Sequence, residues 1–210
     1  GVLCLLSDST RAEFPGYTPS ERTVGEAFRE IMEGLDGRVI VATFASNIAR
    51  VQQVFDAAAT FGRKVAVIGR SMEQNTRIAS DLGYLRWVPD QLVPKDRIRD
   101  VPDGELVIAT TGAQGEPMAG LARMANRDHR FVEVTPGDTV IVSASPIPGN
   151  EEYVARTVDN LFKLGANVYY HANKRAHVSG HASQEELKLM LNLAKPRHFI
   201  PVHGEFRMLV

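Results

Sequence analysis

The residues best suited to chemistry are an aspartate and several histidines close to apolar runs. Asp8 follows the first apolar run of the chain, and His203 follows the last one. His177 and His181 have the four-residue spacing of a helical metal pair, but Gly180 between them favours a loop. A carboxylate beside an imidazole can fix the ring tautomer and raise its basicity, as proton transfer requires. Asp-Ser-Thr is equally suited to cap a turn or helix, so spacing alone leaves both interpretations of Asp8 open.

A second set of candidates lies in loops rich in Gly, Ser and Pro. These loops cover residues 45–47, 111–117, 143–150, 173–183 and 203–205. Each follows a predicted strand, and three lead directly into predicted helix N-termini, where exposed backbone N–H groups suit a phosphate. One such loop on its own is more often an ordinary turn. Five loops at the same edge of one sheet favour a shared ligand site.

The elements that must position these residues alternate between short β-branched strands and amphipathic helices. The periodicity predicts strands over 39–44, 64–69, 105–110, 139–143, 167–171 and 198–202, and helices over 20–32, 47–61, 71–82, 117–127, 151–164 and 184–193. Ser183 and Glu186 have the spacing of a capping box, and Gly165 stands where a helix C′ glycine belongs. Nearly continuous apolar strands joined by helices predict an α/β fold, with a parallel sheet covered on both faces.

Bulk composition is that of an ordinary globular protein and excludes several classes. Hydrophobic residues make up 44% and charged residues 23%, and neither a membrane-length apolar run nor a signal peptide is visible. The net charge of −1 gives no overall basic face for nucleic acid. Cys4 is the only cysteine, which excludes an internal disulfide, and we expect it to be buried in a strand. A cytoplasmic location without membrane attachment is the default expectation.

Both ends of the chain are apolar and strand-like. Residues 1–6 already form a core-like run, and residues 208–210 are apolar again. Natural domains seldom start and stop inside core elements, so we expect this sequence to be a piece of a larger protein.

Several motifs, taken in order, resemble the ribonuclease J family in the β-CASP branch of the metallo-β-lactamase superfamily. The matching words are Leu6-Ser-Asp-Ser-Thr10, Ala42-Thr-Phe-Ala-Ser-Asn47, Arg50-Val-Gln-Gln53, Thr110-Thr-Gly-Ala-Gln-Gly-Glu-Pro-Met118, Ser145-Pro-Ile-Pro-Gly-Asn-Glu151, His177-Val-Ser-Gly-His181 and Pro201-Val-His-Gly-Glu205. They span essentially the whole chain, and the joint pattern is specific although no single word is. The resemblance implies a two-zinc enzyme that cleaves single-stranded RNA, as a 5′-to-3′ exoribonuclease and endoribonuclease in RNA decay and ribosomal RNA maturation. It also implies a homo-oligomeric parent enzyme.

The resemblance further implies roles for individual residues. His181 would act at the scissile phosphate as a proton donor to the leaving oxygen, and Asp8 would orient it. His203 would be a ligand to one zinc ion. Small residues let phosphate approach the backbone closely, and the segments implied to hold RNA phosphates consist of Ala45, Ser46, Asn47, His177, Val178, Ser179, Gly180 and His181.

The main metal motif of the superfamily, His-x-His-x-Asp-His, does not occur in this sequence. A zinc site needs three or four protein ligands, and the resemblance supplies only His203. We therefore expect this chain alone to bind zinc weakly and to cleave nothing.

The expected organisation is a β-CASP domain over residues 20–194, framed by metallo-β-lactamase segments at 1–19 and 195–210. Three alternatives stay open. One is another β-CASP RNA-processing enzyme with a different substrate, and another is a catalytically idle RNA-binding or assembly module. A Rossmann-like nucleotide-binding domain is the third, but no Gly-x-Gly-x-x-Gly follows the first strand.

Overall fold

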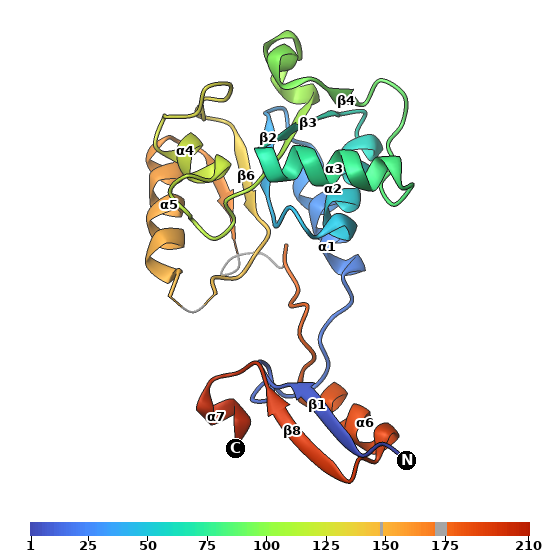
Figure 1. Ribbon diagram of the computed structural model, residues 1–210. Helices are drawn as coiled ribbons and strands as arrows, with labels where there is room; N and C mark the ends of the chain where they lie inside the picture. Colours follow the sequence, from blue (N-terminus) through green and yellow to red (C-terminus); the bar gives the residue numbers. More distant parts are fainter. Residues whose placement is uncertain (148, 171–175) are drawn as a thin grey trace. The chain divides into compact units, whose positions relative to one another are not determined.

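The computed structural model describes residues 1–147, 149–170 and 176–210, which form two compact units (Figure 1). The larger unit consists of Glu21–His177, and the smaller unit combines Gly1–Ser20 with Val178–Val210. None of the helices in the described residues has both the length and the apolar character that a membrane crossing needs.

The larger unit is built on a six-stranded parallel sheet in the order β4-β3-β5-β2-β6-β7. Its strands are β2 (Val39–Ala42), β3 (Lys64–Ile68), β4 (Leu92–Val93), β5 (Leu106–Thr110), β6 (Thr139–Val142) and β7 (Asn167–Tyr169). The four central strands are buried along nearly their whole length, as strands covered on both faces must be. The predicted α/β fold with a parallel sheet is confirmed.

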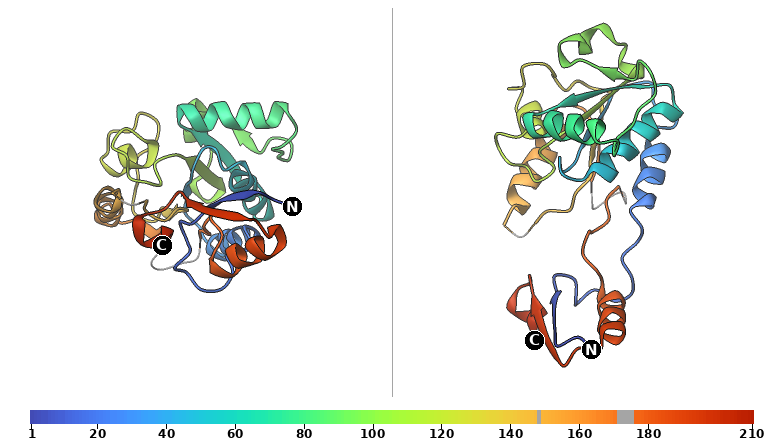
Figure 2. Two further views of the ribbon diagram at one scale, coloured as in Figure 1. Left: turned by 60° about the horizontal axis from the view of Figure 1, so that its bottom comes forward. Right: turned by 45° about the vertical axis from the view of Figure 1, so that its right-hand side comes forward.

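Helices cover both faces of this sheet, as the right-handed crossovers between parallel strands require (Figures 1 and 2). One face carries α1 (Arg22–Met32), α2 (Ile48–Thr60) and α3 (Arg70–Asp81), and the other carries α4 (Gly120–Ala125) and α5 (Glu151–Lys163). Alternate strand residues such as Ile40, Ile108 and Val140 form one apolar core with Leu121 and Val158. The predicted glycine after α5 is confirmed, since Gly165 has a φ of 82°.

Two features of this unit differ from the prediction. No strand or helix was predicted between residues 82 and 105, but this segment contains the edge strand β4 and the short 3-10 helices η1 (Lys95–Asp100) and η2 (Asp103–Glu105). A two-residue strand carries no usable periodicity, which explains the miss. The strand predicted over 167–171 ends at Tyr169, and His171 lies outside the described residues.

The smaller unit contains a two-stranded parallel sheet of β1 (Cys4–Asp8) and β8 (His198–Val202), with the helices α6 (Gln184–Ala194) and α7 (Phe206–Leu209). The predicted capping box is confirmed, because Glu186 accepts a hydrogen bond of 2.8 Å from the Ser183 N–H at the start of α6. Cys4 is half-buried rather than buried. The two helices of this unit are too few to cover both faces of its sheet, which explains the partial exposure of Cys4.

The expectation that all five polar loops share one sheet edge is wrong. Loops after β2, β5, β6 and β7 do follow strands of the six-stranded sheet, but the loop at His203 follows β8, which pairs only with β1 among the described strands. Strand β8 pairs with a partner almost 200 positions away, and local patterning carries no information on such a pairing. For the same reason α6, expected within a domain of 20–194, lies in the smaller unit, where Thr18 bonds to its capping box.

Candidate functional site

Asp8, His181 and His203 lie together in the smaller unit. Parallel pairing places Asp8 opposite Val202, so the residues that end β1 and follow β8 share one end of the two-stranded sheet. His181 comes from the loop that precedes α6. One possible ligand atom from each of the three residues lies within 4.8 Å of the others. Sequence spacing could not have shown this cluster, because Asp8 and His181 are separated by 173 positions.

Both carboxylate oxygens of Asp8 are engaged. Oδ1 accepts hydrogen bonds from the Thr10 hydroxyl at 2.6 Å and the Thr10 N–H at 2.9 Å. Oδ2 lies 2.5 Å from Nδ1 of His181. The expected proximity of Asp8 and His181 is therefore confirmed, although their roles are a separate matter. With Nδ1 directed to Asp8, the other ring nitrogen, Nε2, is the one left to face a ligand.

The backbone of His181 is fixed on both sides. Its N–H donates to the Ser179 hydroxyl at 3.1 Å, and its carbonyl accepts from the Thr18 hydroxyl at 2.8 Å. Thr18 also lies 2.9 Å from the Ser183 hydroxyl and donates its N–H to Glu186 at 2.9 Å. The capping box of α6 is thus part of the support for His181. This explains why the turn around Gly180 can hold an imidazole in one orientation.

His203 occupies a backbone conformation that few residues adopt. Its φ is 55°, in the left-handed region. The carbonyl of His203 lies within hydrogen-bond reach of the Thr10 hydroxyl, and a Cβ on the next residue, Gly204, would lie 2.8 Å from the Ser9 hydroxyl. Backbone strain held by the surrounding structure is common at functional sites. Here it brings the His203 ring to 5.3 Å from that of His181, centroid to centroid.

The electrostatics keep Asp8 ionised. Partial burial raises the pKa of Asp8, but hydrogen bonds from the Thr10 side chain and backbone, and the contact with His181, outweigh it and lower the pKa to about 2. A charged carboxylate at Nδ1 fixes the orientation of the His181 ring.

The three side chains also match the donor chemistry of a metal site. Imidazole nitrogens and carboxylate oxygens are ordinary zinc ligands, and the cluster is compact enough for a common ion. However, the bond between Asp8 and His181 ties those two groups to each other. His203 contributes the third possible ligand atom of the cluster, and its role as a metal ligand stays a prediction.

The implied phosphate-binding residues fall in both units. Ala45, Ser46 and Asn47 follow β2 in the larger unit, where Ser46 is exposed. The Asn47 side-chain oxygen accepts from the Arg50 N–H at 3.1 Å and caps α2, so this oxygen serves the helix. The Ala45 carbonyl accepts a hydrogen bond from the Asn75 side-chain amide at 2.9 Å, which fixes the loop. Ser46 is then the exposed side-chain donor of this loop.

The remaining implied residues lie around the boundary between the units. His177 ends the larger unit, whereas Val178, Ser179, Gly180 and His181 belong to the smaller unit. Val178 is buried, and Gly180 is exposed. The nearby cations Lys174 and Arg175 lie outside the described residues.

Arg50 is a supporting residue whose role the sequence motifs did not reveal. The residue is 1% exposed, yet it binds both carboxylate oxygens of Glu21 at 2.7 and 2.8 Å. The same guanidinium donates to the Ser143 carbonyl at 2.9 Å and lies 2.7 Å from Nδ1 of His177. Ser143 in turn donates to the Ala176 carbonyl. Arg50 therefore fixes the loop after β6 and the segment that ends at His177.

The carboxyl edge of the six-stranded sheet is also hollowed. Loops after β2, β3 and β5 line a cavity of about 780 Å³ that includes Ala45, Arg70, Gln114 and Arg123. Gln114 bridges two loops, since its amide donates to the Ser145 carbonyl and accepts from the Ile147 N–H, both at 2.8 Å. This cavity is where an open parallel sheet places its ligands.

Two family models match the chain. Residues 36–161 match the model described as "Ribonuclease J, beta-CASP domain", and residues 165–210 match "Zn-dependent metallo-hydrolase RNA specificity domain". Together they cover most of both units.

Several curated proteins are similar over the full chain. Ribonuclease J of Thermus thermophilus is 52% identical over 207 residues, which cover 99% of this chain and 36% of that protein. Ribonuclease J2 of Bacillus subtilis is 50% identical over 208 residues, covering 99% and 37%. Ribonuclease J of Mycobacterium tuberculosis is 49% identical over 209 residues, covering 100% and 38%. The chain thus spans little more than a third of the length of these relatives.

Proposed function

Because the chain belongs to the ribonuclease J family, we propose that it supplies a proton-donating dyad, one metal ligand and RNA-binding loops to a zinc-dependent ribonuclease. The observation that carries the proposal is the cluster of Asp8, His181 and His203 at one end of the small sheet. An Asp–His pair can serve as a general acid, and a further histidine can bind a metal ion, two functions that contribute to metal-assisted phosphodiester hydrolysis.

His181 is the general acid of the proposed reaction. Water loses a proton to solvent as its oxygen adds to phosphorus, the bond from phosphorus to the leaving oxygen breaks, and His181 Nε2 transfers its proton to that oxygen. Asp8 holds Nδ1 at 2.5 Å and so orients the ring with Nε2 towards the leaving oxygen. A proton donated in the transition state is worth typically 10²–10⁴-fold in rate.

His203 is the proposed zinc ligand. Zinc, when bound, lowers the pKa of a coordinated water and neutralises charge on the phosphate. Asp8 and His181 are bonded to each other through Oδ2 and Nδ1, and in this proposal they act as the proton-donating pair rather than as metal ligands. The 210-residue chain alone is therefore proposed to bind zinc weakly and to lack hydrolytic activity.

The proposed substrate is single-stranded RNA, cleaved both from its 5′ end and internally. Ser46 is exposed beside the edge of the large sheet, and Ser179 and Gly180 lie beside His181. Neutral hydroxyl and backbone N–H donors contact phosphates without reading sequence, so we expect little sequence preference.

A chimera tests the proposal directly. The segment of the Thermus thermophilus relative that matches this chain is replaced by residues 1–210, and cleavage of a 5′-monophosphorylated single-stranded RNA is followed with zinc present. We expect cleavage by the chimera and a loss of roughly 10²-fold or more on His181→Ala. Loss of zinc is expected on His203→Ala.

The matched control is His198→Ala, an exposed histidine at the opposite end of β8 from His203. This variant should cleave at the rate of the unmodified chimera. A folded chimera that binds RNA without cleaving it would refute the proposal and favour an idle RNA-binding module. Equal losses in the His181 and His198 variants would refute the assignment of the general acid.

A further inference from the structure

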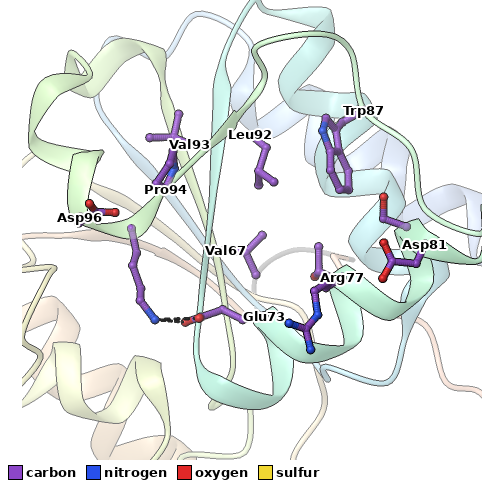
Figure 3. A pocket seen from close by; sticks show the side chains of 12 residues that line it. Val67, Glu73, Arg77, Asp81, Trp87, Leu92, Val93, Pro94 and Asp96 are labelled. Atoms are coloured by element: carbon purple, nitrogen blue, oxygen red, sulfur yellow. Dashed lines mark hydrogen bonds and ion pairs between the residues drawn. The ribbon is translucent and has the colours of Figure 1, made fainter.

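A cavity of about 520 Å³ lies between α3 and the edge strand β4 in the larger unit (Figure 3). Val67, Leu92 and Val93 form its apolar wall, and the Trp87 indole stands beside them. The indole is held in place by stacking on Phe55, with ring centroids 5.2 Å apart and an interplanar angle of 23°. An apolar cavity with a fixed aromatic side chain suits a flat ring.

One polar group that lines this cavity is buried without a hydrogen-bond partner among the described residues. Thr76 is 4% exposed, and its hydroxyl has no partner. Buried hydroxyls are nearly always bonded, and an exception calls for an explanation. A ring that carries a hydrogen-bond donor or acceptor would satisfy the Thr76 hydroxyl.

A second cavity of about 500 Å³ adjoins the first along α3. Arg70, Gln74 and the shared residues Glu73, Arg77 and Lys95 line it. Arg70 and Arg77 are seven residues apart in the helix and therefore lie on the same face, about two turns from each other. Lys95 bonds to Glu73 at 2.7 Å. Three cations facing a single carboxylate make this cavity basic.

The charges of the two cavities differ in sign. In the first, Asp81 and Asp96 add to Glu73 and outnumber Arg77 and Lys95. A phosphate is therefore disfavoured in the first cavity and favoured in the second, whereas a neutral ring with amino groups is favoured in the first. Arg77 lines both and stands where the two parts of such a ligand would join.

We propose that the two cavities form one binding site for a nucleoside phosphate. The base occupies the cavity beside Trp87 and hydrogen-bonds to the Thr76 hydroxyl, and the phosphate lies between Arg70 and Arg77. Stacking on or against an aromatic ring and contact with arginine are how proteins bind single nucleotides within RNA as well as free ones. The site goes beyond the proposed hydrolytic function, because all of its residues belong to the larger unit.

Intrinsic fluorescence tests the site without a label, because Trp87 is the only tryptophan of the chain. The 210-residue chain is titrated with 5′-AMP, with an adenosine octamer RNA, and with adenosine or inorganic phosphate alone. We expect saturable change of Trp87 emission, and tighter binding of 5′-AMP than of either of its halves. If the octamer changes the Trp87 emission and 5′-AMP does not, the site binds RNA. If 5′-AMP binds as tightly as the octamer or more tightly, the site binds free nucleotides.

Two variants and one matched control complete the test. Arg77→Glu should weaken binding roughly tenfold or more, the loss expected for one charged hydrogen bond. Thr76→Val keeps the shape of the side chain and removes only the hydroxyl, so it should weaken binding about fivefold. Arg97→Glu reverses an exposed charge that already pairs with Asp100 on η1, and should bind as the unmodified chain does.

The proposal is overturned if no ligand changes the emission of Trp87. It is equally overturned if Arg77→Glu and Arg97→Glu weaken binding to the same extent, because the effect would then be one of overall charge. A failure of the RNA-cleaving chimera leaves these outcomes unaffected, so the two proposals fail separately.

Discussion

Removing the buried arginine at the start of α2 should destabilise the larger unit more than any exposed charge. Arg50 is 1% exposed and holds Glu21, the Ser143 carbonyl and the His177 ring. In Arg50→Ala the Ser143 carbonyl loses this donor in a fully buried position, which costs about 1–3 kcal/mol. Glu21 keeps 31% side-chain exposure and is partly rehydrated. Breaking such a pair together with the cavity left behind gives about 3–5 kcal/mol.

Two further variants sharpen this expectation. Arg50→Lys keeps the charge but loses the bidentate geometry of the guanidinium, so it should cost roughly half as much. Arg156→Ala is the matched control, since Arg156 and Glu152 form an exposed helical pair with side-chain exposures of 63% and 84%. Exposed pairs of this kind contribute about 0.3–0.5 kcal/mol.

Urea denaturation followed by Trp87 emission measures these free energies of unfolding, because Trp87 belongs to the larger unit. An Arg50→Ala variant no less stable than Arg156→Ala would refute the reasoning. It would mean that the network around Arg50 does not hold the fold together, and that its geometry serves only the loops it contacts.

Three further changes probe other parts of the account. Asp138→Ala breaks a buried ion pair with Arg38 at 2.6 Å and should cost about 3 kcal/mol in the same urea assay. Gly204→Ala brings a Cβ to 2.8 Å from the Ser9 hydroxyl; the resulting crowding should destabilise the smaller unit by about 1–3 kcal/mol, measured by amide hydrogen exchange. The Asp8 pKa of about 2 lies below its ordinary value of 3.8, so its stabilising contribution is present above pH 3.8 and lost as the pH falls towards 2. Asp8→Asn should abolish that part of the acid dependence of hydrogen exchange in the smaller unit, and an unchanged dependence would contradict the pKa shift.

Much of the larger unit could be predicted from local patterning. Strands buried on both faces read as short continuous apolar runs, so β2, β3, β5 and β6 were located within one or two residues of their observed bounds. The edge strand β4 was missed, because two residues at a sheet margin carry no pattern. The first strand was expected to begin at residue 1 and to end at Asp8. Its end is confirmed, but it begins only at Cys4, because its extent is set by pairing with β8 and not by composition.

Less of the candidate site could be predicted from the sequence. Its residues were named through the family resemblance, since nothing in the spacing joins Asp8 to His181. The capping box at Ser183 was visible, but its bond to Thr18 and its support of His181 were not. Arg50 belongs to one of the motifs of the family resemblance, but no role was assigned to it. The residue type alone does not reveal whether an arginine is buried or exposed. Long-range pairing and burial are properties of the folded chain, which explains why these features required a structure.

The most direct test of the central claim asks whether His181 gives its proton to the leaving oxygen. In the Thermus thermophilus chimera, cleavage of an ordinary RNA linkage is compared with cleavage of a linkage whose leaving oxygen is replaced by sulfur. A thiolate leaves without protonation, so it has no need of a general acid. We expect His181→Ala to slow the oxygen substrate by roughly 10²–10⁴-fold and the sulfur substrate by less than about tenfold. Equal slowing of both substrates would contradict the assignment of His181 as the proton donor.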